Sequence, residues 1–275
     1  MSDGAVLEAE LLDVARAAAR AAAGELLARY ERAAEGLATK TSATDPVSDA
    51  DRAAEAAIRA LLAQRRPGDA ILGEEGGETA GTDESGGVRW VVDPLDGTAN
   101  YLFGYPQWSV SVAAEDAAGA TLAGVILDPL RGEEVSATRS GPLLRDGAPA
   151  PGGGDGSRPR ATTLDVALVA TGFAYDAGVR ARQAEVLPRL LPRVRDVRRG
   201  GSAALDLAWT ALGRLDAYWE RGVQAWDVAA GALLCARAGL ELRELPAADG
   251  LPWGLLAAPP AFADELLALV GGGAP

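Results

Sequence analysis

The run from Trp90 to Tyr101 constrains this chain more than any other stretch, because apolar residues lead directly into two carboxylates and a Gly-Thr pair. Val91 and Val92 are typical of the end of a buried strand. Pro94 disfavours a helix at the residue before it, and Gly97 permits a close turn into the residues that follow. The run therefore predicts a strand end at which acidic side chains and backbone groups converge.

Two kinds of ligand group meet at this predicted strand end. Asp93, Asp96 and the Leu95 carbonyl are oxygen donors, which suit a hard divalent cation. The amides from Gly97 onward lie at the start of a helix and suit a phosphate. A site for both predicts metal-assisted phosphoryl chemistry. Taken alone, the two aspartates are equally compatible with a simple turn.

Composition limits which other chemistry is available. The chain of 275 residues has no histidine and one cysteine, Cys235. A zinc site is therefore nearly excluded, and a Ser-His-Asp triad is excluded. Cys235 lies in an apolar helical run and is interpreted as a small buried side chain. The chemistry has to be carried out by carboxylates, hydroxyls and a metal.

The charge and the N-terminus predict where the protein works and what it avoids. The net charge of −13 argues against a nucleic-acid surface. The first residues lack the pattern of a signal peptide, and no apolar stretch approaches the ~20 residues that span a bilayer. We expect a soluble, cytoplasmic protein that does not bind membranes. The negative charge would also repel an anionic substrate unless cations neutralised the site.

The acidic run resembles the signature of the inositol monophosphatase family, in which Asp-Pro-(Ile/Leu)-Asp-Gly-Thr is followed by x-Asn-(Phe/Tyr). Other stretches match the same family in the same order along the chain. They are Asp45-Pro46-Val47-Ser48-Asp49-Ala50-Asp51, Gly73-Glu74-Glu75, Gly200-Gly201-Ser202-Ala203-Ala204-Leu205-Asp206 and Trp226-Asp227-Val228-Ala229-Ala230-Gly231. The resemblance extends from about Lys40 to the C-terminus.

Apolar periodicity predicts the elements of the first half. We expect a long helix over 6–37, which Gly24 is able to break, a loop over 40–46 and a helix over 48–64. A short strand over 69–73 precedes an acidic, glycine-rich segment over 76–87, interpreted as a mobile loop. Four strands, mostly an antiparallel meander, follow over 89–92, 108–115, 122–128 and 134–138.

A Pro- and Gly-rich segment over 145–160 predicts the boundary between two subdomains. Residues 1–150 would form an α+β subdomain with most metal ligands, and 151–275 an α/β subdomain with the substrate loop and the last ligand. In the second half we expect strands over 166–171, 193–198 and 217–220 and helices over 178–191, 203–212, 226–238 and 262–270. This alternation indicates an α/β class, and the resemblance implies a layered α-β-α-β-α sandwich of two packed subdomains.

The resemblance also implies a metal site with two or three Mg²⁺ ions. Glu74, Asp93 and Leu95 would hold one ion, and Asp93, Asp96 and Asp227 a second. Without the resemblance, Asp227 is compatible with an ordinary helix cap, and the Glu74-Glu75 pair with a solvated acidic surface.

Asp51 and Thr98 form a second pair whose role the resemblance supplies. A threonine hydroxyl bonded to a carboxylate can relay a proton, and in the family the matching pair activates the attacking water. Glu74 is counted with this pair as catalytic. The amides of Gly97 and Thr98 would hold the phosphate oxygens.

On the alcohol side of the substrate, the positions that match the family are Gly201, Ser202, Ala203 and Glu220. Glu220 could accept hydrogen bonds from vicinal hydroxyls, although an exposed strand-end charge is the alternative. Lys40 matches a lysine near the metals or is a solvated loop residue. The basic residues of the following region are interpreted as surface or interface charges: Arg193, Arg195, Arg198 and Arg199.

The sequence therefore predicts a Mg²⁺-dependent phosphomonoesterase for a small polyol or sugar phosphate, with inositol 1-phosphate as the leading substrate. Alternative substrates on this fold are histidinol phosphate, fructose 1,6-bisphosphate and 3′-phosphoadenosine 5′-phosphate. An alternative of another class is a regulatory protein that binds a protein partner. Lithium inhibition and a homodimer are expectations from the family resemblance.

Overall fold

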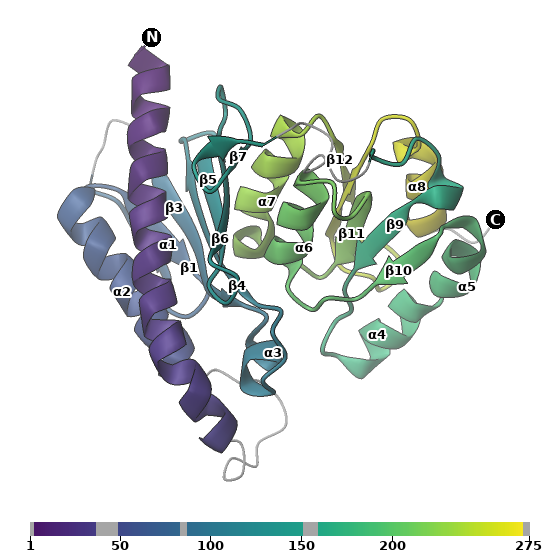
Figure 1. Cartoon of the computed structure of the whole chain (residues 1–275), viewed down its shortest axis with the longest axis horizontal. Helices are drawn as coiled ribbons and strands as arrows, with labels where there is room; N and C mark the ends of the chain where they lie inside the picture. The colour runs from purple at the N-terminus through teal and green to yellow at the C-terminus, as the bar shows by residue number, and fades with distance from the viewer. Residues whose placement is uncertain (1–2, 37–48, 83–86, 151–158, 272–275) are drawn as a thin grey trace.

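The central strands of this chain are buried along almost their whole length, so each sheet needs a layer of helices on either face. The computed structural model describes residues 3–36, 49–82, 87–150 and 159–271. Figure 1 shows the result: two sheets alternate with three layers of helices. The predicted α-β-α-β-α sandwich is confirmed.

The first sheet contains eight strands in the order β2-β1-β3-β4-β5-β6-β7-β8. β1 is parallel to β3, and the remaining neighbours are antiparallel, as the meander predicts. Their bounds are β1 (Ala70–Gly73), β2 (Gly77–Thr79), β3 (Arg89–Asp96), β4 (Ser109–Glu115), β5 (Thr121–Asp128), β6 (Glu133–Thr138), β7 (Leu144–Arg145) and β8 (Ala148–Pro149).

β3 continues beyond the predicted end at Val92. Asp93 still pairs with Ser111, and Asp96 pairs with Ser109, with a shift of register between the two pairs. The shift accommodates Pro94, which has no amide to donate to a ladder. Both aspartates are therefore held by the sheet rather than by a loop.

The segment 76–87 was wrongly interpreted as loop throughout, because its residues 77–79 form β2. This strand pairs with β1 in the register Ile71 with Thr79 and Gly73 with Gly77. It completes a tight hairpin directly after Glu74. Residues 83–86 of this segment and the predicted loop over 40–46 lie outside the described residues.

Two helices cover the outer face of the first sheet: α1 (Asp3–Gly36) and α2 (Asp49–Arg65). α1 runs through Gly24 without a break. Ala22, Ala23 and Leu26 are buried on either side of this glycine, and the glycine itself faces solvent. Packing of its neighbours therefore outweighs the low helix propensity of a single glycine.

The second sheet has five strands in the order β10-β9-β11-β13-β12. β9 is parallel to both neighbours, whereas β13 is antiparallel to β11 and to β12. The bounds are β9 (Leu168–Thr171), β10 (Asp196–Arg198), β11 (Ala217–Arg221), β12 (Glu241–Leu245) and β13 (Gly254–Ala258). Strands β12 and β13 were not predicted, because both are short and β12 carries three charged residues among five.

Helices α6 (Ala203–Ala211) and α7 (Ala225–Arg237) fill the layer between the sheets (Figure 1). Side chains from both sheets and both helices share one core cluster there, which includes Val91, Ala230 and Tyr218. Cys235 belongs to it and is fully buried, as interpreted from the sequence. The proposed division near residue 150 remains a prediction.

The outer layer consists of α4 (Ala177–Ala184), α5 (Leu187–Leu190), α8 (Ala263–Val270) and two 3₁₀ turns, Leu164–Val166 and Leu191–Arg193. The prediction of one continuous helix over 178–191 was wrong. The ring of Pro188 would clash with the carbonyl of Ala184, four residues earlier, in a continuous helix. α4 therefore ends at Ala184, and α5 begins separately. Within the described residues, no helix is both long enough and apolar enough to cross a bilayer.

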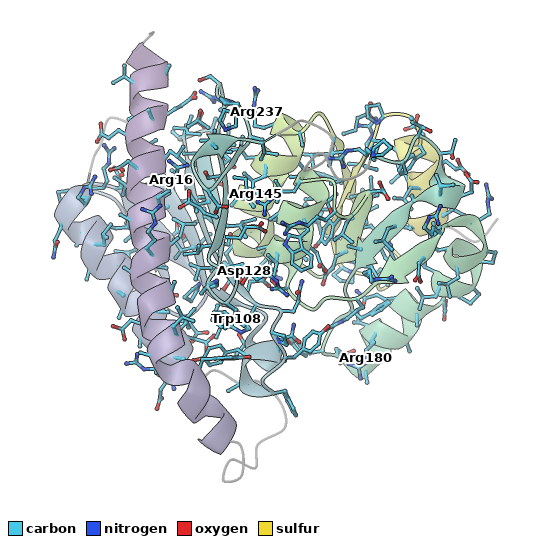
Figure 2. The ribbon with its side chains drawn as sticks, viewed as in Figure 1. Arg16, Trp108, Asp128, Arg145, Arg180 and Arg237 are labelled. Carbon is cyan, nitrogen blue, oxygen red and sulfur yellow. The ribbon has the colours of Figure 1, made fainter. Side chains whose placement is uncertain are left out.

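An aromatic cluster fixes α3 (Thr98–Leu102), the short helix that follows β3. The rings of Tyr30, Tyr101 and Trp108 lie 5.1–5.3 Å apart between centroids, and Figure 2 labels Trp108 at the place where α1 and α3 approach. The Tyr101 hydroxyl donates to the Leu26 carbonyl at 2.8 Å. Desolvation, reinforced by the nearby negative charge of Asp51, raises the pKa of Tyr101 to about 12.

Replacing Tyr101 with Phe should lower the free energy of unfolding by about 1 kcal/mol, because the buried hydrogen bond to Leu26 is lost while the ring contacts remain. Urea denaturation in the presence of chelator measures this change. Tyr105→Phe is the matched control, since its side chain is 54% exposed, and it should have no effect. Equal losses in the two variants would contradict this account of the α1–α3 contact.

Candidate active site

A cleft of about 320 Å³ opens where β1 and β3 end and where α3, α6 and α7 begin. Ten of the residues predicted for the site line it: Glu74, Asp93, Leu95, Asp96, Gly97, Thr98, Gly201, Ala203, Glu220 and Asp227. Asp51 and Ser202 do not line the cleft and contact residues that do. Because these residues come from distant parts of the sequence, the tertiary fold brings them together.

An acidic cluster lies at one end of the cleft. Among the described residues, Asp93, Asp96 and Asp227 each place a carboxylate oxygen within 4.8 Å of the others. Glu74 follows β1, is open to solvent and has a side-chain hydrogen bond with Asp93. The four side chains are all carboxylates, so each offers an oxygen ligand and none of the four carries a positive charge. This donor set fits a hard divalent cation such as Mg²⁺.

The pKa values of the cluster show the cost of bringing these carboxylates together without a cation. Desolvation raises the pKa of all four groups, and repulsion from neighbouring carboxylates raises it further for Glu74, Asp93 and Asp227. The pKa of Glu74 rises to about 8 and that of Asp227 to about 7. The pKa of Asp93 lies well above its usual value, with desolvation first and the charge of Glu74 second among the causes.

Local backbone geometry holds each buried aspartate in place. Asp93 accepts a hydrogen bond from the Leu95 amide at 2.9 Å, which stabilises the bend at Pro94. Asp227 belongs to a capping box of α7, with the Gln224 amide 2.6 Å from one of its oxygens. Capping and cation binding are therefore compatible roles for Asp227, because its carboxylate has two oxygens.

Asp96 is the anchor of α6. It accepts hydrogen bonds from the Ser202 hydroxyl and from the amides of Ala203 (3.2 Å) and Ala204 (2.8 Å). Burial raises the pKa of Asp96 in spite of these donors, which lower it. The positive end of a helix thus faces a carboxylate at the floor of the cleft.

Ser202 occupies a different place from the one the sequence suggested. Its side chain is fully buried, donates to Asp96 and accepts the Leu205 amide at 3.3 Å as the N-cap of α6. Its hydroxyl therefore supports Asp96 and the start of the helix and does not face the cleft. Gly201 and Ala203, its neighbours, do line the cleft.

Thr98 and Asp51 are in direct contact. The Thr98 hydroxyl lies 3.0 Å from an Asp51 oxygen and also 3.0 Å from the Leu95 carbonyl. Asp51 is buried on the first turn of α2. A hydroxyl has one proton for two acceptors, and donation to Asp51 leaves its lone pairs available on the cleft side.

Gly97 shows why the turn before α3 requires glycine. Its φ is +93°, and a Cβ would lie 3.0 Å from the Gln107 carbonyl and 3.2 Å from that of Gly201.

Asn100 donates to the carbonyls of Gln107 at 2.6 Å and Gly200 at 3.0 Å. Asn100 therefore ties the β3–α3 turn to the loop before α6. It was not singled out from the sequence, although it belongs to the signature.

Glu220 is partly buried at the end of β11 and accepts a hydrogen bond from the Tyr218 hydroxyl at 3.1 Å. Desolvation, followed by the charges of Asp206 and Asp96, raises the pKa of Glu220 to about 8. Asp206 is buried behind the cleft with a pKa of about 8, for which desolvation and the charge of Asp96 are the causes. Burial therefore favours the protonated form of both carboxyl groups, Glu220 and Asp206.

Arg199 was interpreted as a surface or interface charge, and the structure places its exposed side chain at the edge of the cleft. The other three arginines fit a surface role. Arg193 pairs with Glu265, Arg198 pairs with Asp196, and Arg195 donates to a backbone carbonyl. Arg221, Phe173, Tyr175 and Val223 also line the cleft without having been predicted, since side chains that line a cleft carry no local sequence pattern.

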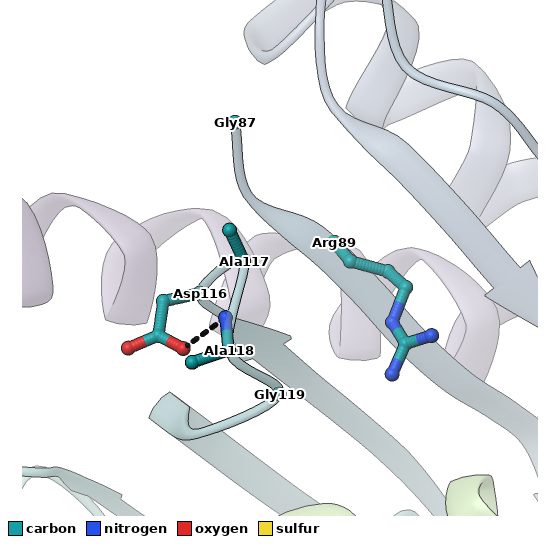
Figure 3. A pocket seen from close by; sticks show the side chains of 6 residues that line it. All are labelled: Gly87, Arg89, Asp116, Ala117, Ala118 and Gly119. Carbon is teal, nitrogen blue, oxygen red and sulfur yellow. Dashed lines mark hydrogen bonds between the residues drawn. The ribbon is translucent and has the colours of Figure 1, made fainter. Parts of the chain in front are cut away.

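A second hollow lies at the turn between β4 and β5 (Figure 3). Its charged groups are already engaged: Arg89 pairs with Glu115, and Asp116 accepts the amides of Ala118 and Ala120. It contains no convergent set of reactive groups among the residues that line it. The acidic cleft is therefore the candidate active site.

Comparisons with known proteins match this chain to one family. The sequence model described as "Inositol monophosphatase family" matches residues 7–270. A relative in Mycobacterium tuberculosis, named inositol-1-monophosphatase SuhB, is 47% identical over 249 residues, which cover 86% of this chain and 83% of the relative. A Pseudomonas aeruginosa relative, named Nus factor SuhB, is 41% identical and covers 83% of each chain. A solved structure of an inositol monophosphatase from Anabaena superposes with a TM-score of 0.77 at 32% identity, covering 94% of each chain.

The stability of the metal-free protein should fall as pH rises from about 4.5 to 8. The folded cluster holds protons up to pH 7–8, whereas the unfolded chain releases them near the usual values of 3.8 and 4.5, so the folded state binds more protons throughout this window. Urea unfolding in chelator at several pH values measures the slope.

Mg²⁺ should reduce this loss of stability, because it replaces the protons as counter-charge. Asp227→Asn should flatten the slope in chelator by removing one of the titrating groups. A slope that neither Mg²⁺ nor Asp227→Asn alters would show that the cluster is not its source.

Proposed function

Because the chain belongs to the inositol monophosphatase family, we propose that this phosphatase is a Mg²⁺-dependent phosphomonoesterase that uses the acidic cleft as its active site. The observation that carries the proposal is the convergence of three aspartate oxygens within 4.8 Å beside the Thr98–Asp51 hydrogen bond. A cation site and a proton acceptor then lie on one side of the same cleft.

Glu74, Asp93, Asp96, Asp227 and the Leu95 carbonyl are the proposed cation ligands. Their oxygen-only chemistry and the mutual repulsion of the carboxylates both favour binding of a divalent cation. When bound, two or three Mg²⁺ ions would neutralise the phosphate and stabilise the charge that develops on the leaving oxygen.

Asp51 and Thr98 are proposed to orient the attacking water and accept its proton. Thr98 donates to the buried Asp51 carboxylate, so its oxygen can accept a hydrogen bond from a water in the cleft. The proton passes to the Thr98–Asp51 pair as the water oxygen bonds to phosphorus and the ester P–O bond breaks, and the departing alcohol oxygen takes a proton from a second water. The amides of Gly97 and Thr98 would bind the phosphate oxygens.

The alcohol portion of the substrate is proposed to lie toward Gly201, Ala203 and Glu220, which also line the cleft. The small side chains leave room for a ring, and Glu220 can bond vicinal hydroxyls. Inositol 1-phosphate is the leading substrate, with support from the name of the M. tuberculosis relative. Histidinol phosphate, fructose 1,6-bisphosphate and 3′-phosphoadenosine 5′-phosphate are the alternatives. Lithium sensitivity and a homodimer stay predictions.

A second candidate function is binding to a protein partner. The observation in its favour is the name of the P. aeruginosa relative, Nus factor SuhB, which is 41% identical to this chain. Such a role would not require the acidic cluster, and the retention of that cluster favours the enzymatic proposal. The two functions are compatible in one chain.

Purified protein should release phosphate from inositol 1-phosphate in Mg²⁺ and not in chelator, when assayed beside the three alternative substrates. Asp93→Asn should reduce the rate by orders of magnitude because it removes a ligand central to the cluster, while leaving any binding to a protein partner intact. If no substrate is turned over although Mg²⁺ binds, the phosphatase proposal is wrong and the binding role takes precedence.

Asp51→Asn should lower kcat by about 10²–10⁴-fold, because the Thr98 hydroxyl loses its carboxylate partner, and should leave the Mg²⁺ dissociation constant unchanged. Asp49→Asn is the matched control on the same helical turn, where an exposed carboxylate pairs with Arg52 at 3.3 Å, and it should behave as wild type. Similar kcat values for Asp51→Asn and Asp49→Asn would rule out the proposed relay.

A further inference from the structure

Glu55 is a buried carboxylate outside the proposed machinery. It lies on α2, with 3% of its surface exposed. Its two oxygens accept the backbone amides of Glu75 at 2.8 Å and Gly76 at 2.9 Å. These amides belong to the β1–β2 turn, whose first residue is Glu74.

Arg59, one helical turn after Glu55, completes the attachment of this hairpin. Its Nε lies 2.7 Å from a Glu55 oxygen. Its two terminal nitrogens donate to the Gly77 carbonyl at 2.7 Å and to the Thr79 hydroxyl at 2.9 Å. The side chains of one face of α2 therefore bind β2 and the turn before it.

The backbone closes on Glu55 without spare room. A Cβ at Gly73 or at Gly76 would lie 2.6 Å from a Glu55 oxygen, which is closer than a Cβ atom approaches a neighbouring heavy atom. The two glycines flank Glu74 and Glu75, so the segment can approach the carboxylate only because it lacks side chains on that side.

The remaining support of Glu74 comes from the sheet. Its amide donates to the Val92 carbonyl at 3.3 Å, next to Asp93. Its side chain has a hydrogen bond with Asp93, and a glutamate side chain loses freedom when it binds a cation. A turn that is already fixed reduces how much further ordering binding requires.

We propose that Glu55 and Arg59 are positioning residues that hold the β1–β2 turn so that Glu74 is presented to the cation beside Asp93. The inference rests on the proposed function, because it assigns Glu74 to the cation. Asp51 lies four residues before Glu55 on the same helix. α2 therefore fixes both the partner of Thr98 and the turn that bears Glu74.

The test is the Mg²⁺ affinity of full-length Glu55→Gln, measured by titration calorimetry. Glutamine keeps the shape but loses the charge and one of the two acceptors. We expect the Mg²⁺ dissociation constant to rise about 10- to 100-fold, the range typical of groups that orient a metal ligand. At saturating Mg²⁺ kcat should stay close to wild type, because Glu55 does not touch the substrate.

Glu134→Gln is the matched control. Glu134 is equally buried, at 5%, and pairs with Arg16 and Arg20 on α1, away from the cleft (Arg16 is labelled in Figure 2). This variant should lose stability and keep its Mg²⁺ affinity. An affinity loss in Glu55→Gln beyond that in Glu134→Gln therefore reports positioning and not general destabilisation.

Arg59→Met, at a partly exposed position, should also raise the Mg²⁺ dissociation constant. If Glu55→Gln does not fold, this variant tests the positioning role instead. Unchanged Mg²⁺ affinity in the folded variants, with normal binding by wild type, overturns the positioning role alone. A wild-type protein that binds no Mg²⁺ overturns the proposed function and this inference together.

Discussion

The structure depends on holding several carboxylates together at the mouth of a low-dielectric core. Asp93 and Asp96 are almost completely buried, and Asp227 lies against them. Repulsion of this kind destabilises a fold unless protons, donors or a cation compensate. The protein uses backbone donors first: the Leu95 amide on Asp93, the start of α6 on Asp96 and the start of α7 on Asp227. The remaining negative charge is what would favour a divalent cation in the cleft.

The strands and helices of the layers position both the aspartates of the cleft and the backbone groups that bind them. β3 supplies two aspartates, and its irregular register at Pro94 directs both toward the cleft. The middle helices, α6 and α7, each begin at an aspartate oxygen, so the helix ends that face the cleft are positive. α2 and α3 bring Asp51 to Thr98. One geometric arrangement therefore serves folding and chemistry.

The sequence predicted the features that have a local pattern. The run 90–101 predicted its carboxylates and its turn, and periodicity found α1, α2, α6, α7 and α8. The sequence failed where contacts with other elements determine the structure. β12 carries charged residues and little apolar pattern. The helix α1 continues through Gly24 because its neighbours are packed, and β3 continues past Pro94 because β4 pairs with it. Glu55 and Arg59 look like ordinary helix-surface charges in sequence. Only the hairpin folded onto them makes them part of the site.

The aspartates of the acidic cluster come from distant parts of the sequence. Asp93 and Asp96 lie on the first sheet, whereas Asp227 arrives on α7, which packs between that sheet and the second one. During synthesis, a chain that has emerged only as far as the first sheet carries two aspartates of the cluster but not the third. The cluster is therefore completed only when α7 docks against the first sheet. A complete cluster is thus a marker that the layer of helices between the two sheets has formed.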